Sequence, residues 1–205
     1  RLDAAGDGGA LIVRSSAQNI VLTGALHSGK SSLVRTVLKG ITPLCRGIFS
    51  VPLTDGKRCI GYALQFKDEE RLHVFAHENM NSALRFDRYG IHLEPFSAAA
   101  GYIRRALEQP PALFVIDEIG VMEETTKAYW QAIAELTASP IPTLLVVQQR
   151  ALPMLKKATD FEHLQIFELL TDHRQRTATA ILQALAAVDE QADRWPSNFN
   201  EENQK

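Results

Sequence analysis

The chain has little of what marks three large classes of protein. Its 205 residues include two cysteines, Cys45 and Cys59, without CxxC spacing. This count argues against a disulfide scaffold and favours reduced thiols in a cytoplasmic protein. No apolar run reaches membrane-spanning length. The 22 basic and 24 acidic residues leave a net charge of −2, so the sequence predicts neither a nucleic-acid nor a membrane binder.

The most informative stretch is residues 19–32, NIVLTGALHSGKSS. An apolar run predicts a buried strand at 19–23, a loop of pattern G-x-x-x-x-G-K-S follows, and an apolar helix face begins at Leu33. A strand, a glycine-bounded loop and a helix in this order are the context that a phosphate-binding P-loop requires. The alternative is an ordinary Gly/Ser turn before a helix, but the three elements together favour the P-loop. The stretch therefore predicts nucleotide binding.

The residue types of this loop suit a triphosphate. Gly24 and Gly29 permit backbone angles that a side chain would block, so successive N–H groups can turn toward one phosphate chain. The helix that opens at Lys30 adds unpaired N–H groups and the positive end of its dipole. The pattern predicts that Lys30 contacts the β- and γ-phosphates and that the Ser31 hydroxyl binds Mg²⁺. The predicted nucleotide-binding residues are Gly24, Ala25, Leu26, His27, Ser28, Gly29, Lys30, Ser31 and Ser32.

Composition divides the chain into three parts. Residues 1–18, rich in Gly and Ala, are expected to form an N-terminal arm, and the polar residues 189–205 a disordered tail. Residues 19–188 are expected to fold as one domain. Within it, residues 41–94 consist of short apolar runs separated by turn residues, with Asp-Gly between two of them. This pattern predicts a β-meander inserted after the first helix.

The remainder of the predicted domain alternates strands with helices. Another short strand is expected within 87–96, and a helix capped by Ser97 should run to about Leu107. Buried strands are expected at 112–116, 142–147 and 163–169, and helices at 122–137, at 153–158 and from Asp172 onward. This alternation predicts an α/β fold with a mainly parallel sheet flanked by helices and a ligand at the carboxyl ends of the strands.

An acidic pair, Asp117-Glu118, ends the apolar run 113–116, a strand expected to lie beside the P-loop strand. Asp117 would emerge at the carboxyl edge of the sheet, where it can hold Mg²⁺ through water or together with Ser31. Glu118 can accept a proton from, or orient, the water that attacks the γ-phosphate. The alternative is a carboxylate placed by the dipole of a following helix. The P-loop favours the metal and base roles.

The other site candidates carry less specific signals. Gln148 and Gln149 follow the next strand, where a polar side chain either senses the γ-phosphate or is an ordinary loop residue. Charge that develops in the transition state is often neutralised by an arginine. Arg150 is the first choice as this catalytic arginine, with Arg88 and Arg174 as alternatives. An arginine from a neighbouring subunit would serve equally.

With these residues, the sequence from 19 to 188 resembles a family of small nucleoside-triphosphatases. Members of this family are described in thermophiles, and one is known as the cancer-related nucleoside triphosphatase. Beyond the P-loop, the closest match is VIDEIGVME at 115–123, which is similar to the family signature D-E-I-G-x-M-E. Further matches to the family's hairpin and to its R-Y-G-like segment are Gly47, Arg58, Gly61 and Tyr62, and Arg88, Tyr89 and Gly90. The chain departs from the family at the loop filling A-L-H-S, at Pro52 and at Val121, which bears on its substrate range.

The resemblance implies a RecA-like sheet of the P-loop NTPase class. It also implies slow, Mg²⁺-dependent hydrolysis of several nucleoside triphosphates, ATP and GTP among them, to diphosphates. The family's phosphate-binding and acidic roles carry over to Gly24, Gly29, Lys30, Ser31, Asp117 and Glu118. In this scheme, Lys30 or an arginine neutralises the charge that develops during hydrolysis.

Two other functions fit the same residues. A small-molecule or nucleotide kinase would need an acceptor pocket and usually an arginine-rich lid, and the sequence has no compact arginine cluster. A non-enzymatic nucleotide-dependent switch or assembly factor would bind nucleotide tightly and act on a protein partner or a second copy of the chain. The sequence leaves the preferred base, the oligomeric state and the partner open.

Overall fold

The computed structural model describes residues 19–39, 45–120, 126–159, 164–170 and 173–189. Their strands are β1 (Asn19–Thr23), β2 (Cys45–Asp55), β3 (Arg58–Phe66), β4 (Leu72–His77), β5 (Arg85–Phe86), β6 (Tyr89–Ile91), β7 (Leu113–Ile119), β8 (Thr143–Val147) and β9 (Leu164–Glu168). Their helices are α1 (Lys30–Leu38), α2 (Glu94–Glu108), α3 (Lys127–Ala138), α4 (Leu152–Ala158) and α5 (Arg174–Asp189). The predicted arm, almost all of the predicted tail, Val121 and the expected helix start at Asp172 lie outside the described residues.

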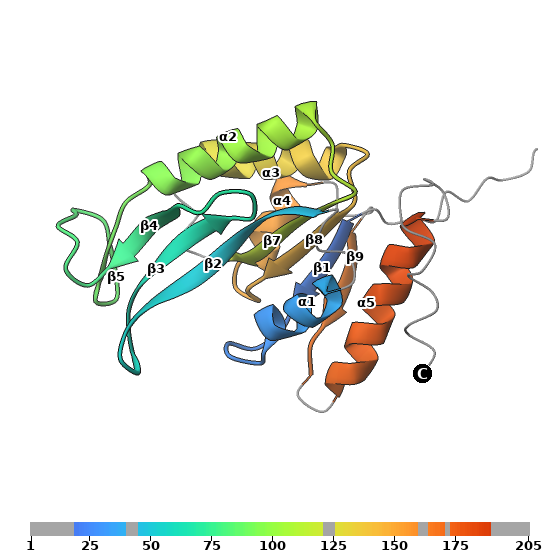
Figure 1. The fold of residues 1–205 in the computed structure, drawn as a ribbon, viewed down its shortest axis with the longest axis horizontal. Coiled ribbons are helices and arrows are strands. Elements are labelled where there is room, and N and C mark those ends of the chain that lie inside the picture. The colour runs from blue at the N-terminus through green and yellow to red at the C-terminus, as the bar shows by residue number, and fades with distance from the viewer. Residues whose placement is uncertain (1–18, 40–44, 121–125, 160–163, 171–172, 190–205) are drawn as a thin grey trace, which may run out of the picture.

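The strands form one sheet in the order β5-β6-β4-β3-β2-β7-β8-β1-β9 (Figure 1). The pairs from β2 through β7, β8 and β1 to β9 are parallel, and the pairs from β2 through β3, β4 and β6 to β5 are antiparallel. Helices α1 and α5 pack on one face, while α2, α3 and α4 cover the other. The predicted α/β sheet flanked by helices is therefore confirmed.

The strand that carries the acidic pair does not lie beside the P-loop strand. Strand β8 lies between β7 and β1, with Thr143 opposite Asn19 on one side and Phe114 on the other. The Thr143 hydroxyl also donates a 2.8 Å hydrogen bond to Asn19 Oδ1. All five residues of β8 are buried, as expected for a strand covered on both faces and paired at both edges. The predicted adjacency was wrong because chain order alone does not show which buried strand takes the central position.

The meander predicted after the first helix is present, and it extends the main sheet. Strand β2 pairs in parallel with β7 along one edge and antiparallel with β3 along the other. Strands β2 and β3 are joined at Gly56, whose φ of 59° suits a tight turn. The short strand expected within 87–96 is β6, and the two-residue β5 pairs with it just before that region. An aromatic row packs this half of the sheet against α2: Phe66 stacks on Tyr102 at 4.7 Å, and Phe75 lies 5.1 Å from Phe96.

Helix α2 begins at Glu94, three residues before the predicted cap at Ser97. Leu93 occupies the N-cap position, and Pro95 lies in the first turn. Proline suits a first turn because its φ is already helical and its missing N–H would have no helical partner there. Ser97 instead donates its backbone N–H to the Leu93 carbonyl at 3.3 Å. A proline in the first turn was therefore the better signal for this helix start.

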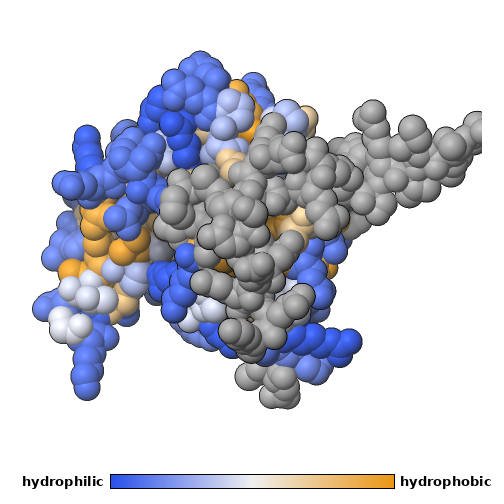
Figure 2. Space-filling model, turned by 45° about the vertical axis from the view of Figure 1, so that its right-hand side comes forward, coloured by the Kyte–Doolittle hydropathy of each residue, from blue (hydrophilic) through white to orange (hydrophobic). Residues whose placement is uncertain are grey.

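Outside the atoms drawn in grey, Figure 2 shows a mainly hydrophilic surface with apolar side chains confined to small areas. Among the described residues, the exposed large apolar side chains are Leu26, Leu72, Phe86 and Leu170. Cys45 is buried and Cys59 is half-buried, and neither is part of a disulfide, in agreement with the predicted reduced thiols. In the part of the chain that the structure describes, no helix has the length and apolar character needed to cross a bilayer.

Candidate functional site

The loop between β1 and α1 has the backbone of a phosphate cradle. Gly24 and Gly29 adopt φ values of 149° and 89°, and His27 between them is also left-handed at 60°. A Cβ on Gly24 would lie 2.9 Å from the Leu169 carbonyl oxygen, so a larger residue would collide with backbone. The Gly29 carbonyl accepts the Leu33 N–H at 3.0 Å and so closes the first turn of α1. The two glycines thus permit the conformation that the sequence pattern predicted.

Lys30 is the first residue of α1, and its side chain folds back over the loop. Its Nζ donates to the carbonyl oxygens of Gly24 and Ala25, at 3.1 and 2.8 Å, and only 7% of the residue is exposed. Burial lowers the pKa of this ammonium, while Glu118 and Asp117 oppose that shift. The lysine of the loop and the acidic pair at the end of β7 are therefore within electrostatic reach of one another.

Asp117 is a buried carboxylate near the end of β7, with 1% of its surface exposed. Neither of its oxygens is hydrogen-bonded to a described residue. Burial raises the pKa of this carboxyl to about 6, and nearby Glu118 adds to the shift, whereas the Ser31 hydroxyl, Arg35 and Lys30 oppose it. A buried anion without a well-formed hydrogen bond is costly, and bound cations are one way in which proteins offset that cost.

The donor set around Asp117 fits a hard divalent cation. Mg²⁺ prefers oxygen ligands and is usually bound through one or two carboxylates, water and substrate phosphates. Asp117 supplies two unpartnered carboxylate oxygens, and the neighbouring Ser31 supplies a hydroxyl. The described residues contain no cluster of three or more His, Cys, Asp or Glu side chains that could hold a metal by itself. This combination suits a metal that shares its ligands with a bound phosphate chain.

Glu118, the next residue, has a strained backbone with φ at 86°. Its position coincides with a register shift between β7 and β8. A non-glycine residue in the left-handed region costs on the order of 1 kcal/mol and persists where its surroundings hold it. Its Oε1 accepts a 2.7 Å hydrogen bond from the Gln148 amide at the end of β8. The strain turns the chain at the carboxyl edge of the sheet, next to the Lys30 region.

Of the two glutamines after β8, only Gln148 contacts the acidic pair. The Gln149 amide instead donates to Glu168 Oε1 on β9 at 2.9 Å. Sequence reasoning treated the two residues as equivalent because both follow the same strand. Gln148 reaches the adjacent strand β7, whereas Gln149 reaches β9, which lies beyond β1 on the other side of β8, and only the sheet order shows this.

The three predicted arginine candidates lie in different places. Arg174, at the start of α5, lies against the loop: a Cβ on Gly29 would collide with its Nη1. Arg88 belongs to the meander, where it donates to the Cys59 carbonyl at 2.7 Å and the Tyr89 hydroxyl at 2.8 Å. Arg150 is exposed in the turn between β8 and α4. The arginine that the structure brings to the loop is Arg174, the lower-ranked alternative.

Two residues at the site had no assigned role in the sequence analysis. The Thr23 hydroxyl, at the end of β1, is buried and without a hydrogen-bond partner among the described residues. Gly120 leaves room for the side chain of Gln148. Thr23 carries a usable signal, since a small polar residue ends an otherwise apolar strand. Gly120 stands in the signature after the acidic pair, but its partner is 28 positions away.

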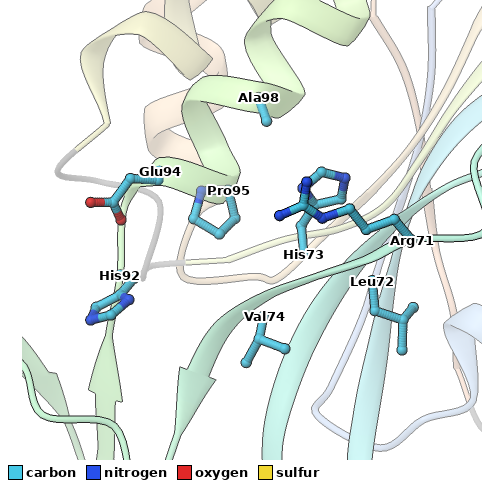
Figure 3. Close-up of a pocket in the computed structure, with 8 residues that line it drawn as sticks. All are labelled: Arg71, Leu72, His73, Val74, His92, Glu94, Pro95 and Ala98. Atoms are coloured by element: carbon cyan, nitrogen blue, oxygen red, sulfur yellow. The ribbon is translucent and has the colours of Figure 1, made fainter.

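A hollow of about 580 Å³ lies elsewhere, between β4 and the first turns of α2 (Figure 3). Glu94, Pro95 and Ala98 line it from the helix side, and His92 lies near the helix start. The remaining lining residues are Arg71, Leu72, His73 and Val74. It shares no residue with the predicted nucleotide site, so it is a separate feature of the meander half.

Comparison with known proteins gives a consistent match. A family model described as NTPase matches residues 19–182. The nucleoside-triphosphatase THEP1 of Methanopyrus kandleri is 30% identical over 136 residues, which cover 65% of this chain and 74% of that protein. The protein of the same name from Thermotoga maritima is 22% identical over 166 residues, covering 81% and 94%.

Two solved structures share the fold. THEP1 from Aquifex aeolicus superposes with a TM-score of 0.68 at 21% identity and covers 82% of this chain and 98% of its own. A human cancer-related nucleoside triphosphatase gives 0.70 at 19% identity, covering 82% and 97%. The residues matched by the family model include both the loop at 24–32 and the acidic pair Asp117-Glu118. The chain therefore belongs to the NTPase family, the nucleoside-triphosphatases.

Proposed function

We propose that the protein hydrolyses nucleoside triphosphates, ATP and GTP among them, to the diphosphate and inorganic phosphate in a Mg²⁺-dependent reaction. Residues 24–32 hold the phosphate chain, and Lys30 turns from the loop carbonyls to the β- and γ-phosphates. Glu118 takes a proton from a water molecule while the water oxygen attacks the γ-phosphorus. The bond between the γ-phosphorus and the bridging β–γ oxygen then breaks. The supporting observation is that Lys30 lies within electrostatic reach of both Asp117 and Glu118.

Asp117 and Ser31 are the residues that would hold Mg²⁺. The two unpartnered oxygens of Asp117 and the nearby hydroxyl of Ser31 support this assignment. When bound, the metal neutralises charge on the β- and γ-phosphate oxygens. The chain's own part is to fix Asp117 at the end of β7, where Ser31, Arg35 and Lys30 oppose the rise in pKa that burial causes. A titration of Mg²⁺ against phosphate release tests this dependence, and full turnover in excess EDTA would contradict it.

Arg174 replaces Arg150 as the arginine assigned to neutralise transition-state charge. Its guanidinium already lies over Gly29 of the loop, whereas Arg150 is exposed after β8. Removing a group that stabilises transition-state charge typically costs about 10²- to 10³-fold in kcat. The matched variants are Arg174→Ala and Arg150→Ala. Loss of kcat in the second variant and not in the first would return the role to Arg150.

The experiment that tests the proposed function is phosphate release from ATP, GTP, CTP and UTP with Mg²⁺, with Glu118→Gln measured alongside. Loss of a general base is expected to lower kcat by about 10²-fold or more while nucleotide binding persists. The four rates give the base preference. Binding without phosphate release from any substrate would overturn the proposal, in favour of a kinase that lacks its acceptor or a switch that lacks its partner.

A further inference from the structure

The carboxylate of Glu118 accepts a hydrogen bond from Gln148, a residue whose own backbone is fixed by further hydrogen bonds. Gln148 Nε2 donates to Glu118 Oε1 at 2.7 Å across the two neighbouring strands. The backbone N–H of Gln148 donates to the Ile119 carbonyl at 2.9 Å. Its own carbonyl accepts the N–H groups of Ala151 and Leu152, at 2.9 and 3.2 Å, where α4 begins. The residue is thus fixed both to the segment after Asp117 and to the next helix.

The side chain of Gln148 lies directly over Gly120. A Cβ at Gly120 would be 2.9 Å from Gln148 Nε2, 3.0 Å from Cδ and 3.1 Å from Oε1. No positive φ requires glycine at this position. Glycine is therefore needed at position 120 for space. It lets the Gln148 amide lie against the backbone and reach the carboxylate of Glu118.

We propose that Gln148 is a positioning residue for hydrolysis, an inference that rests on the proposed role of Glu118. Its amide engages one carboxylate oxygen, fixes the orientation of the carboxyl plane and leaves the other oxygen for the attacking water. Such fixing matters because misplacing a catalytic group by about 1 Å can cost about 10²-fold in rate. Gln148 touches neither substrate nor metal in this role and acts only through Glu118.

The two adjacent glutamines provide a matched test. Gln148→Ala is expected to lower kcat by about tenfold or more, while the Kd for a non-hydrolysable nucleotide analogue and KM change less than about threefold. Gln149→Ala, which removes the equivalent amide from Glu168, should keep wild-type kcat. In a Glu118→Gln background, Gln148→Ala should produce no further loss, because the residue through which it acts no longer works as a base.

Gly120→Ala tests the same inference from the other side. The added methyl group should displace the Gln148 amide and lower kcat as Gln148→Ala does. In the double variant Gly120→Ala/Gln148→Ala, the clash is removed, so kcat should match that of Gln148→Ala and any stability lost by Gly120→Ala should return. This pair keeps the test valid even where one single variant folds poorly.

The possible failures are distinguishable. Wild-type kcat in Gln148→Ala, with Glu118→Gln inactive, would overturn the positioning role and leave the proposed function standing. Equal losses in the Gln148 and Gln149 variants, or a Kd weakened as much as kcat falls, would also overturn it. Full activity in Glu118→Gln would remove the proposed base and this inference with it.

Discussion

The two halves of the sheet differ in how some of their carboxylates are paired. In the parallel half, the Thr23 hydroxyl and both Asp117 oxygens are buried without partners among the described residues, and Glu118 is strained. In the antiparallel half, Arg58 is paired with Glu78, and the carboxylate of Glu69 serves both His73 and Arg105. Polar groups without partners cost stability and are available to a ligand, whereas paired groups are not.

The difference teaches where activity and stability reside. Parallel strands place their carboxyl ends at one edge, so the ends of β1, β7 and β8 can face one ligand. The meander has no such common edge, and its inward side chains pack in an aromatic row against α2. Substitutions in the two halves should therefore differ in effect. Those at the carboxyl edge of the parallel strands should lower the rate of hydrolysis, and those under the meander should lower the free energy of unfolding.

The largest effect on activity is expected from Lys30→Ala, which removes the charge aimed at the phosphates. Phosphate release should fall by about 10²- to 10³-fold or more, on the scale of a lost transition-state donor. The free energy of unfolding should change by only about 1 kcal/mol, because the lost hydrogen bonds are local ones to Gly24 and Ala25. Lys57→Ala at the exposed β2–β3 turn is the control, and equal losses in both variants would contradict the division between the halves.

Phe66→Ala should have the opposite signature. Phe66 is 1% exposed and stacks on both His73, at 4.5 Å, and Tyr102, at 4.7 Å. Truncating a buried phenylalanine typically costs about 3–5 kcal/mol, while kcat per folded molecule should remain that of the wild type. Chemical denaturation measures the first quantity and active-site titration the second. Phe86→Ala, at a residue 44% exposed in the same half, should cost less than about 0.5 kcal/mol.

Local patterns predicted the parts of the fold that local physics determines. The strand β1, the loop and the start of α1 follow from one apolar run and two glycines, and the β2–β3 hairpin follows from Asp55-Gly56. The order of β7, β8 and β1 could not be predicted from one sequence. It depends on which buried strand packs between which neighbours, and β7 and β8 have the same apolar character.

The site divides in the same way. Residues 24–32 form one continuous motif and Asp117-Glu118 belongs to another, so each motif could be recognised directly in the sequence. The contact of Gln148 with Glu118 spans 30 positions, and that of Arg174 with Gly29 spans a still larger separation. Both depend on the sheet order and on the start of α5. Tertiary pairing therefore decided which glutamine reached Glu118 and which arginine reached the loop.

The pH dependence of the free energy of unfolding should show the raised pKa of the Asp117 carboxyl. Burial raises the pKa of this carboxyl from 3.8 to about 6, so the folded state binds more protons than the unfolded chain between those values. Stability without Mg²⁺ should therefore fall as pH rises through about 4 to 6, by on the order of 3 kcal/mol in total, and stay low above pH 6. Asp117→Asn should abolish this component in denaturant unfolding, whereas Asp68→Asn, half-exposed beside Arg46, should retain it.

Adding Mg²⁺ should reverse the penalty above pH 6. A cation that binds the ionised Asp117 in the folded state stabilises that state by mass action. The gain should be absent in Asp117→Asn. An unfolding free energy that rises across pH 4 to 6 in the wild type would show that the carboxylate is satisfied in the folded protein, contrary to the contrast between the halves.

The smallest effect is expected from the ion pair that joins α2 to α3. Arg104 Nε lies 3.0 Å from Glu135 Oε2, and the two side chains are 44% and 35% exposed. Because water screens such a pair and both side chains lose rotamer freedom, Arg104→Ala should cost less than about 1 kcal/mol, with no change in kcat. The loss should shrink further in high salt. A cost equal to that of Phe66→Ala would mean that charge pairing, rather than aromatic packing, stabilises the α2 side of the sheet.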